Sequence, residues 1–154
     1  MNNDMNTAKR DLSIAQNDLD VAKSALSGHS IALCKGSSVI VDDKHGIRPM
    51  LDYIAQNVDL SGYSVADIVV GKAVATLFVY SKITAVYARV LSKSALDYLT
   101  EHGIAVEYDT LALNISNRAG DGICPMELCV ADIDDAKEAY IALKNKVEQM
   151  QNRK

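Results

Sequence analysis

Apolar and polar positions along the chain form blocks that predict helices separated by short strands. Residues 12–26 carry apolar side chains at roughly helical spacing, and Gly28 follows the last of them. Two short apolar runs, 29–34 and 38–41, flank a polar turn, which is typical of a β-hairpin. We therefore expect a first helix followed by a hairpin whose two strands are central, or nearly central, in a sheet.

Helical and strand patterns alternate through the rest of the chain. Pro49 begins a short helix, and residues 64–81 are apolar on nearly every side, which predicts a helix that is buried all round. Further strands are expected at 83–90, 104–108 and 111–115, and further helices at 94–101, 124–132 and from 134 onward. This order predicts an α/β fold, a three-layer α-β-α sandwich with a mixed sheet that opens with an antiparallel hairpin.

Length and charge limit the class of protein. The 154 residues, 49% of them hydrophobic, suffice for a single domain at 8–150 after a flexible N-terminal tail at 1–7. A net charge of −4 argues against a nucleic-acid partner. The longest apolar stretch, 65–80, is too short to span a membrane. With no apolar leader at the N-terminus, we expect a cytoplasmic protein without a membrane partner.

A glycine-rich loop at 117–124 leads into the most distinctive helix start of the chain. Cys124 is expected at the N-cap, Pro125 at the first helical position and Glu127 at the third, near the positive end of the helix dipole. A thiol in this place loses its proton more readily than a free cysteine, so Cys124 is a candidate nucleophile. The other two cysteines, Cys34 and Cys129, are expected to be small buried side chains without disulfides.

Asp67 occupies the third position of the helix expected at 64–81, as Glu127 does in its own helix. An acid at this position is often only a helix cap, and that alternative stays open for both residues. Zinc deaminases place H-x-E and P-C-x-x-C at two helix starts. Here Val65 stands where the motif has its histidine, two positions before Asp67, and Cys124 and Cys129 would point about 140° apart on a helix. We therefore expect no metal and no cofactor, and consider Asp67 and Glu127 as candidate acid/base groups.

Four polar residues are candidates for holding a ligand. Arg48 and Arg118 lie in loops near expected helix starts, where a phosphate or carboxylate could meet backbone N–H groups. Asn117 belongs to the same loop as Arg118. Lys72 is a charge on an apolar helix and is expected to extend its ammonium to solvent. Each of these cations, taken singly, is also explained as a solvated surface charge.

Five segments, taken in order, resemble a small bacterial family of unknown function with a cytidine-deaminase-like fold, and the resemblance covers about residues 10–147. The resemblance implies a deaminase-like sheet with helix N-termini around a shared pocket. Because the zinc ligands are missing, it does not imply deaminase activity. The segments are His45–Pro49, Ser64–Ala73, Ala85–Ala88, Gly103–Tyr108, and Asn117-Arg118 together with Cys124–Glu127.

Three functions follow from these observations. The first is a small-molecule binding domain, for a small anionic or nucleotide-like ligand, that keeps the deaminase-like pocket without zinc. The second is a zinc-independent enzyme in which Cys124 is the thiolate nucleophile. The third is a structural or partner-binding protein, with homo-oligomerisation left open. Binding is favoured slightly over catalysis, because the sequence shows no general-base histidine.

Overall fold

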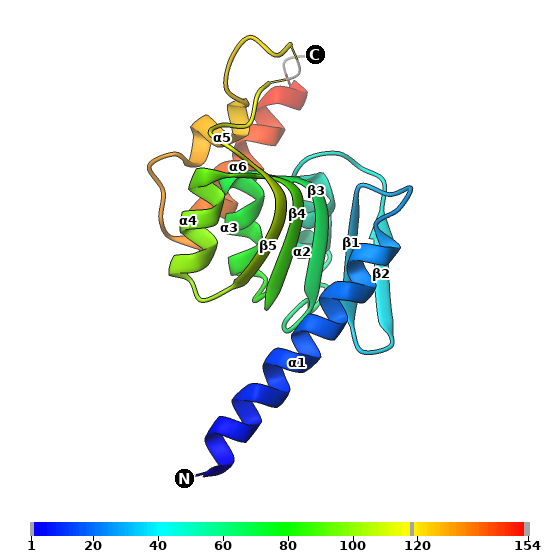
Figure 1. The fold of residues 1–154 in the computed structure, drawn as a ribbon. Helices are drawn as coiled ribbons and strands as arrows, with labels where there is room; N and C mark the ends of the chain where they lie inside the picture. The colour runs from blue at the N-terminus through cyan, green and yellow to red at the C-terminus, as the bar shows by residue number, and fades with distance from the viewer. Residues whose placement is uncertain (1, 118, 153–154) are drawn as a thin grey trace.

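A computed structural model describes residues 2–117 and 119–152 and folds them around one five-stranded sheet. The strand order across the sheet is β2-β1-β3-β4-β5 (Figure 1). The strands are β1 (Ile31–Lys35), β2 (Ser38–Asp42), β3 (Ser64–Val70), β4 (Ala85–Ser92) and β5 (Ala105–Ala112).

Strand directions divide the sheet into an antiparallel part and a parallel part. β1 pairs antiparallel with both β2 and β3, whereas β3, β4 and β5 run parallel. The predicted opening hairpin is therefore confirmed. The expectation that both of its strands are central is wrong for β2, which lies at the sheet edge with Val39 and Val41 well exposed. A two-residue turn suffices for the antiparallel pair, whereas each parallel pair needs a helix as its crossover.

Helices cover both faces of the sheet and confirm the three-layer α/β sandwich. In Figure 1, α1 (Asn2–Ala25) crosses one face, and the remaining helices lie on the other side of the sheet. Those helices are α2 (Arg48–Ala55), α3 (Lys72–Tyr80), α4 (Lys93–Glu101), α5 (Pro125–Val130) and α6 (Ala136–Asn152). These layers are consistent with the deaminase-like fold that the resemblance implies. None of the helices within the described residues has the length and apolar content needed to cross a bilayer.

Two apolar clusters form the core, one on each face of the sheet. The larger lies between the sheet and the helices that follow it, with Phe78 and Leu77 of α3 fully buried. The smaller lies under α1, where Leu19, Ala22 and Leu26 pack on small sheet residues such as Ala66. α1 begins at Asn2, earlier than its apolar repeat predicts. The flexibility expected of residues 1–7 stays a prediction.

The helix predicted at 64–81 is wrong in its first half. Residues 64–70 are strand β3, and α3 begins only after Gly71, its N-cap. A strand in a parallel sheet is buried on both faces, so its apolar residues form a continuous run that periodicity alone does not separate from a buried helix. Asp67 is therefore a strand residue and not the third residue of a helix.

The strand expected at 111–115 is also wrong in its bounds. β5 continues to Ala112, and the chain then enters a loop in which Ser116 and Ile123 form an isolated bridge. The helices expected at 94–101 and 124–132 are present as α4 and α5, with shifts of one or two residues at their ends.

Candidate functional site

A cavity of about 200 Å³ lies at the carboxyl end of β3. The end of β3, the start of α3, the start of α5 and the loop before α2 surround it. In open α/β sheets, ligands bind outside the carboxyl ends of the parallel strands. The side chains that line the cavity include those of Ser30, Lys44, His45, Ile47, Asp67, Ile68, Val69, Val74, Ile115, Cys124, Met126 and Glu127.

Asp67 contributes the most deeply buried carboxyl group of the cavity. It stands on β3 on the same side as the buried Val65, and only 8% of its surface is exposed. Burial raises the pKa of Asp67 to about 7, and hydrogen bonds from the backbone amides of Ile68 and Val69 act in the opposite direction. Within the described residues Asp67 forms no ion pair.

Glu127 reaches across the cavity to the start of a neighbouring helix. Its carboxylate oxygens accept the backbone N–H of Ala73, at N···O distances of 3.2 and 3.4 Å, in the first turn of α3. Glu127 stands in the first turn of α5, as the sequence predicts, and its carboxylate also lies at the positive end of α3. Burial raises the pKa of Glu127, against the lowering effect of the Ala73 and Lys72 amides and the Lys72 charge.

Gly71 makes the approach of Glu127 possible. A Cβ atom at this position would lie 1.8 Å from Glu127 Oε1 and 2.9 Å from Ile115 Cγ1, both far inside van der Waals contact. The backbone of Gly71 is extended, so the glycine is required by the nearness of Glu127 and not by its own torsion angles. The glycine inside the predicted helix thus marks the contact between α3 and α5.

Cys124 is the N-cap of α5, with Pro125 at the first helical position, as the sequence predicts. Its backbone fixes it, because its N–H donates to Ile115 O at 3.0 Å and its carbonyl accepts from Glu127 N at 3.0 Å. The half-buried thiol caps no backbone amide of α5 and borders the cavity. The three candidate catalytic residues, Cys124, Asp67 and Glu127, therefore line one cavity.

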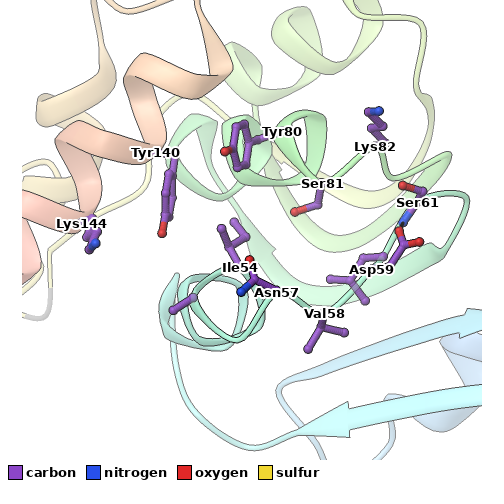
Figure 2. Close-up of a pocket in the computed structure, with 12 residues that line it drawn as sticks. Ile54, Asn57, Val58, Asp59, Ser61, Tyr80, Ser81, Lys82, Tyr140 and Lys144 are labelled. Carbon is purple, nitrogen blue, oxygen red and sulfur yellow. Dashed lines mark hydrogen bonds between the residues drawn. The ribbon is translucent and has the colours of Figure 1, made fainter.

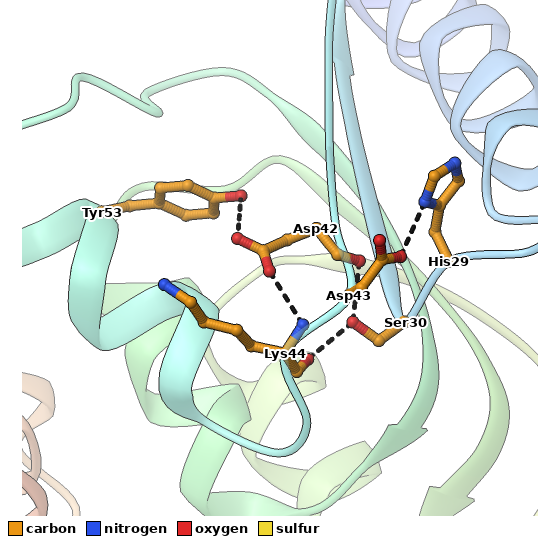
Figure 3. A network of polar contacts seen from close by, with 6 residues as sticks. All are labelled: His29, Ser30, Asp42, Asp43, Lys44 and Tyr53. Carbon is orange, nitrogen blue, oxygen red and sulfur yellow. Dashed lines mark hydrogen bonds and ion pairs between the residues drawn. The ribbon is translucent and has the colours of Figure 1, made fainter.

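His45 also borders this cavity, and sequence reasoning assigned it no role. A polar network holds the loop that carries it (Figure 3). Ser30 Oγ lies 2.8 Å from Asp42 O and 2.6 Å from Lys44 O, so its single hydroxyl hydrogen is shared between the two carbonyls, and Lys44 N donates to Asp42 Oδ1 at 2.8 Å. The signals in the sequence are the acidic turn that ends at His45 and Gly46 and the resembling segment His45–Pro49, because no periodic pattern relates a loop residue to a distant strand.

Two candidate ligand-binding cations stand away from the cavity. Arg48 begins α2 and is exposed, lining a separate hollow. The expectation that Lys72 extends to solvent is wrong, because its residue is only 9% exposed. Lys72 Nζ donates to Ala131 O at 3.0 Å, lies 3.9 Å from Asp134 Oδ1, and stands over the ring of Tyr98. Glu127 separates this ammonium from the cavity, since Glu127 lines the hollows on both sides.

Asn117, from the 117–124 loop, does not line the cavity either. Asn117 Oδ1 accepts the backbone N–H groups of Gly120 and Asp121, at 2.8 and 3.2 Å, and so shapes the loop. Arg118 lies outside the described residues. In residues 2–117 and 119–152, no three His, Cys, Asp or Glu side chains are placed so that they could hold a metal ion.

A larger hollow of about 530 Å³ lies between the ends of α2 and α3 and the side of α6 (Figure 2). The rings of Tyr80 and Tyr140 stack there, with centroids 5.2 Å apart. Its charged residues, Asp59, Lys82 and Lys144, are all exposed. A functional site is marked by titratable groups held out of water, so the cavity at β3 is the stronger candidate.

Comparison with known proteins places this architecture in a family. The family described as a domain of unknown function, DUF1893, matches residues 21–147. A solved structure of a DUF1893 family protein (TM1506) from Thermotoga maritima is similar, with a TM-score of 0.75 and 26% sequence identity, over 87% of this chain and 90% of that chain. No curated protein matches. The family match spans the whole sheet and every segment that lines the cavity, and the chain therefore belongs to the DUF1893 family.

Proposed function

We propose that this protein is a small-molecule binding domain and that its ligand occupies the cavity at the carboxyl end of β3. The observation that carries this proposal is the meeting of two largely buried carboxyl groups, Asp67 and Glu127, in one cavity at the end of a parallel strand. Burying such groups lowers the stability of a protein, and binding or catalysis is the usual reason to retain them.

The size of the cavity limits the ligand. About 200 Å³ corresponds to the volume that roughly seven water molecules occupy in the liquid, so a compact group fits and a whole nucleotide does not. A nucleotide-like ligand would have to leave its phosphate outside. Lys44 is the one lysine or arginine that lines the cavity within the described residues. The anionic or nucleotide-like ligand expected from the sequence stays a prediction.

A variant that fills the cavity tests the proposal. A thermal-shift screen of amines, carboxylic acids and nucleosides at millimolar concentration would first identify ligands of the wild type. Val69 is 42% exposed and lines the cavity, so Val69→Phe should abolish their binding by occupying the space. Val39→Phe is the matched control, because Val39 is similarly exposed on edge strand β2 and far from the cavity lining. Equal binding by both variants would contradict this location.

Catalysis by Cys124 is the second candidate function, and the thiol's place in the same cavity as Asp67, Glu127 and His45 favours it. The test is the rate of alkylation by iodoacetamide in a Cys34→Ser, Cys129→Ser background. A thiolate nucleophile predicts similar rates at pH 6 and pH 8, whereas an ordinary thiol slows about 100-fold at the lower pH. The slower result would remove the nucleophile and leave binding.

A structural or partner-binding role, with or without self-association, is the alternative to both. It predicts that no compound in the screen stabilises the protein and that nothing protects Cys124 from alkylation. The cytoplasmic location expected from the sequence also stays a prediction.

A further inference from the structure

The charges around the cavity are unbalanced. Asp67 and Glu127 present two carboxyl groups to it, from β3 and from α5. The ammonium of Lys44 is paired with Asp52, and both residues line a separate hollow. Lys72 is held beyond Glu127 by Ala131 O and Asp134. The carboxyl groups therefore outnumber the cations that face the same space within the described residues.

Both carboxyl groups keep room for a ligand. Asp67 is more than nine-tenths buried, and among the described residues its carboxyl group receives hydrogen bonds only from the backbone of its own strand. Each carboxylate oxygen of Glu127 has two lone pairs, and the backbone amides of Ala73 and Lys72 occupy only part of this capacity. A ligand N–H group can therefore be accepted at both residues. Apolar side chains supply most of the remaining wall, from Ile47, Val69, Val74, Ile115 and Met126.

We propose that the ligand of this cavity is a small organic cation, an ammonium or amidinium group on a short apolar body, with Asp67 and Glu127 as its counter-ions. This inference rests on the proposed binding function and reverses the charge of the ligand expected from the sequence. A buried carboxylate without a partner is costly, and a charged hydrogen-bonded partner offsets that cost. The apolar wall takes the alkyl part of the ligand, as in most small-molecule sites.

Binding of such a cation is coupled to a proton. The titratable groups around Asp67 are Glu127 and Cys124 from α5, His45 and Lys44 from the loop before α2, and Lys72 beyond Glu127. Because the pKa of Asp67 is about 7, a cation binds the ionised form and releases a proton at pH 6.5. The affinity should rise about tenfold from pH 6 to pH 8 as Asp67 ionises.

Isothermal titration calorimetry with three probes of nearly equal size tests the inference on the intact chain. The probes are n-butylammonium, 1-butanol and butyrate. We expect n-butylammonium to bind at least tenfold more tightly than the others, with a binding enthalpy that changes with the ionisation enthalpy of the buffer at pH 6.5. Asp67→Asn should weaken n-butylammonium at least tenfold and leave 1-butanol unchanged. Asp20→Asn, an exposed acid on α1, is the control and should change neither.

The outcomes separate this inference from the proposal beneath it. Equal or tighter binding of butyrate or 1-butanol would overturn the cation and leave a small-molecule site. If none of the three probes binds, but the wider screen finds ligands that bind the wild type and not Val69→Phe, the cation is likewise overturned and the small-molecule site remains. Failure of the probes and of the whole screen would overturn both. Should Asp67→Asn fold poorly, proton release by the wild type decides, because a cation that pairs with neither carboxyl group of the cavity releases none.

Discussion

Gly71 and Glu127 form the tightest contact of the candidate site. Gly71 has only a hydrogen atom at the position where any other residue would have a side chain. The space is filled by the carboxylate of Glu127 from one side and by Ile115 from the other. Neither neighbour can retreat without loss, because Glu127 satisfies the amide of Ala73 and Ile115 O accepts the amide of Cys124. The contact therefore determines how closely α5 approaches α3.

Gly71→Ala should lower the free energy of unfolding by about 1–3 kcal/mol, the usual cost of overpacking. Urea unfolding followed by circular dichroism measures it. Gly122→Ala is the control, because its Cβ would meet only Asn117 Nδ2 at an ordinary 3.5 Å and its torsion angles suit alanine. Adding Glu127→Ala to Gly71→Ala should cost less than the two changes summed. Strict additivity would show that the clash does not involve Glu127.

Asp67 should make the folded protein less stable as the pH rises. Its folded pKa of about 7 lies above the unfolded value near 3.9, so the folded state holds the extra proton between these values. The sign follows from this: the favourable contribution is complete below about pH 4 and is lost as the pH rises through 7, a change of roughly 4 kcal/mol. Burial raises the pKa of Glu127 as well, which acts in the same direction.

Denaturant midpoints measured from pH 4 to pH 8 check this. Asp67→Asn should flatten the profile and make the variant more stable than wild type at pH 8. A wild-type profile that rises across this range would mean that Asp67 is ionised in the folded protein.

At the scale of elements, the success of sequence reasoning depended on where the deciding interactions lie. The hairpin and α5 were predictable because a turn, or a proline at the first helical position, marks them locally. The boundary between β3 and α3 was not, because both elements are apolar throughout and only Gly71 separates them. The need for glycine at position 71 depends on Glu127, which is distant in sequence.

The candidate site was predictable in the same uneven way. Cys124 and Glu127 were found through the helix start that they share. Asp67 was selected for a helix position that it does not occupy, and it reaches the cavity because β3 ends there. His45 lines the cavity, whereas Arg48 and Lys72 do not. These positions depend on how separate loops and helices pack, which no local pattern encodes.

Two helix starts that are capped differently provide a test at this scale. Ser92 caps its own helix, α4, because its hydroxyl oxygen accepts the backbone N–H of Ala95 at 3.1 Å. The start of α3 is capped from another helix, because the carboxylate of Glu127 on α5 accepts the backbone N–H of Ala73. Ser92→Ala and Glu127→Ala should each cost about 1 kcal/mol of stability. Only Glu127→Ala should speed hydrogen exchange in the segment 113–124, because it also releases α5 from α3. Similar exchange in both variants would show that Glu127 does not hold this segment.

At the scale of the whole molecule, the two faces of the sheet are covered unequally. Five helices share one face, and α1 alone covers the other within the described residues. The small residues beneath α1 allow close packing, and Ser64 Oγ donates to Ala15 O of α1 at 3.0 Å. α1 is therefore a full layer of the domain and not an appendage.

Leu26→Ala should destabilise the whole domain by about 2–4 kcal/mol, because this side chain is 1% exposed and its removal leaves a cavity between α1 and the sheet. Leu26 directly follows α1, and Ile14→Ala within α1 is the comparison: it should change stability by less than about 0.5 kcal/mol, because Ile14 is 59% exposed. Thermal unfolding monitored by near- and far-ultraviolet circular dichroism gives both values. A separate early transition for Leu26→Ala would show that α1 melts independently of the sheet.

The hydrogen bond between Ala73 and Glu127 joins residues that are 54 positions apart in the chain. During synthesis, β3 and α3 leave the ribosome well before the segment that closes the cavity over them. A nascent chain that stops short of residue 124 has Asp67 in place but neither the thiol nor the second acid. Until α5 packs against α3, water can still reach the carboxyl group of Asp67. The free-energy cost of removing this group from water therefore arises only when α5 docks.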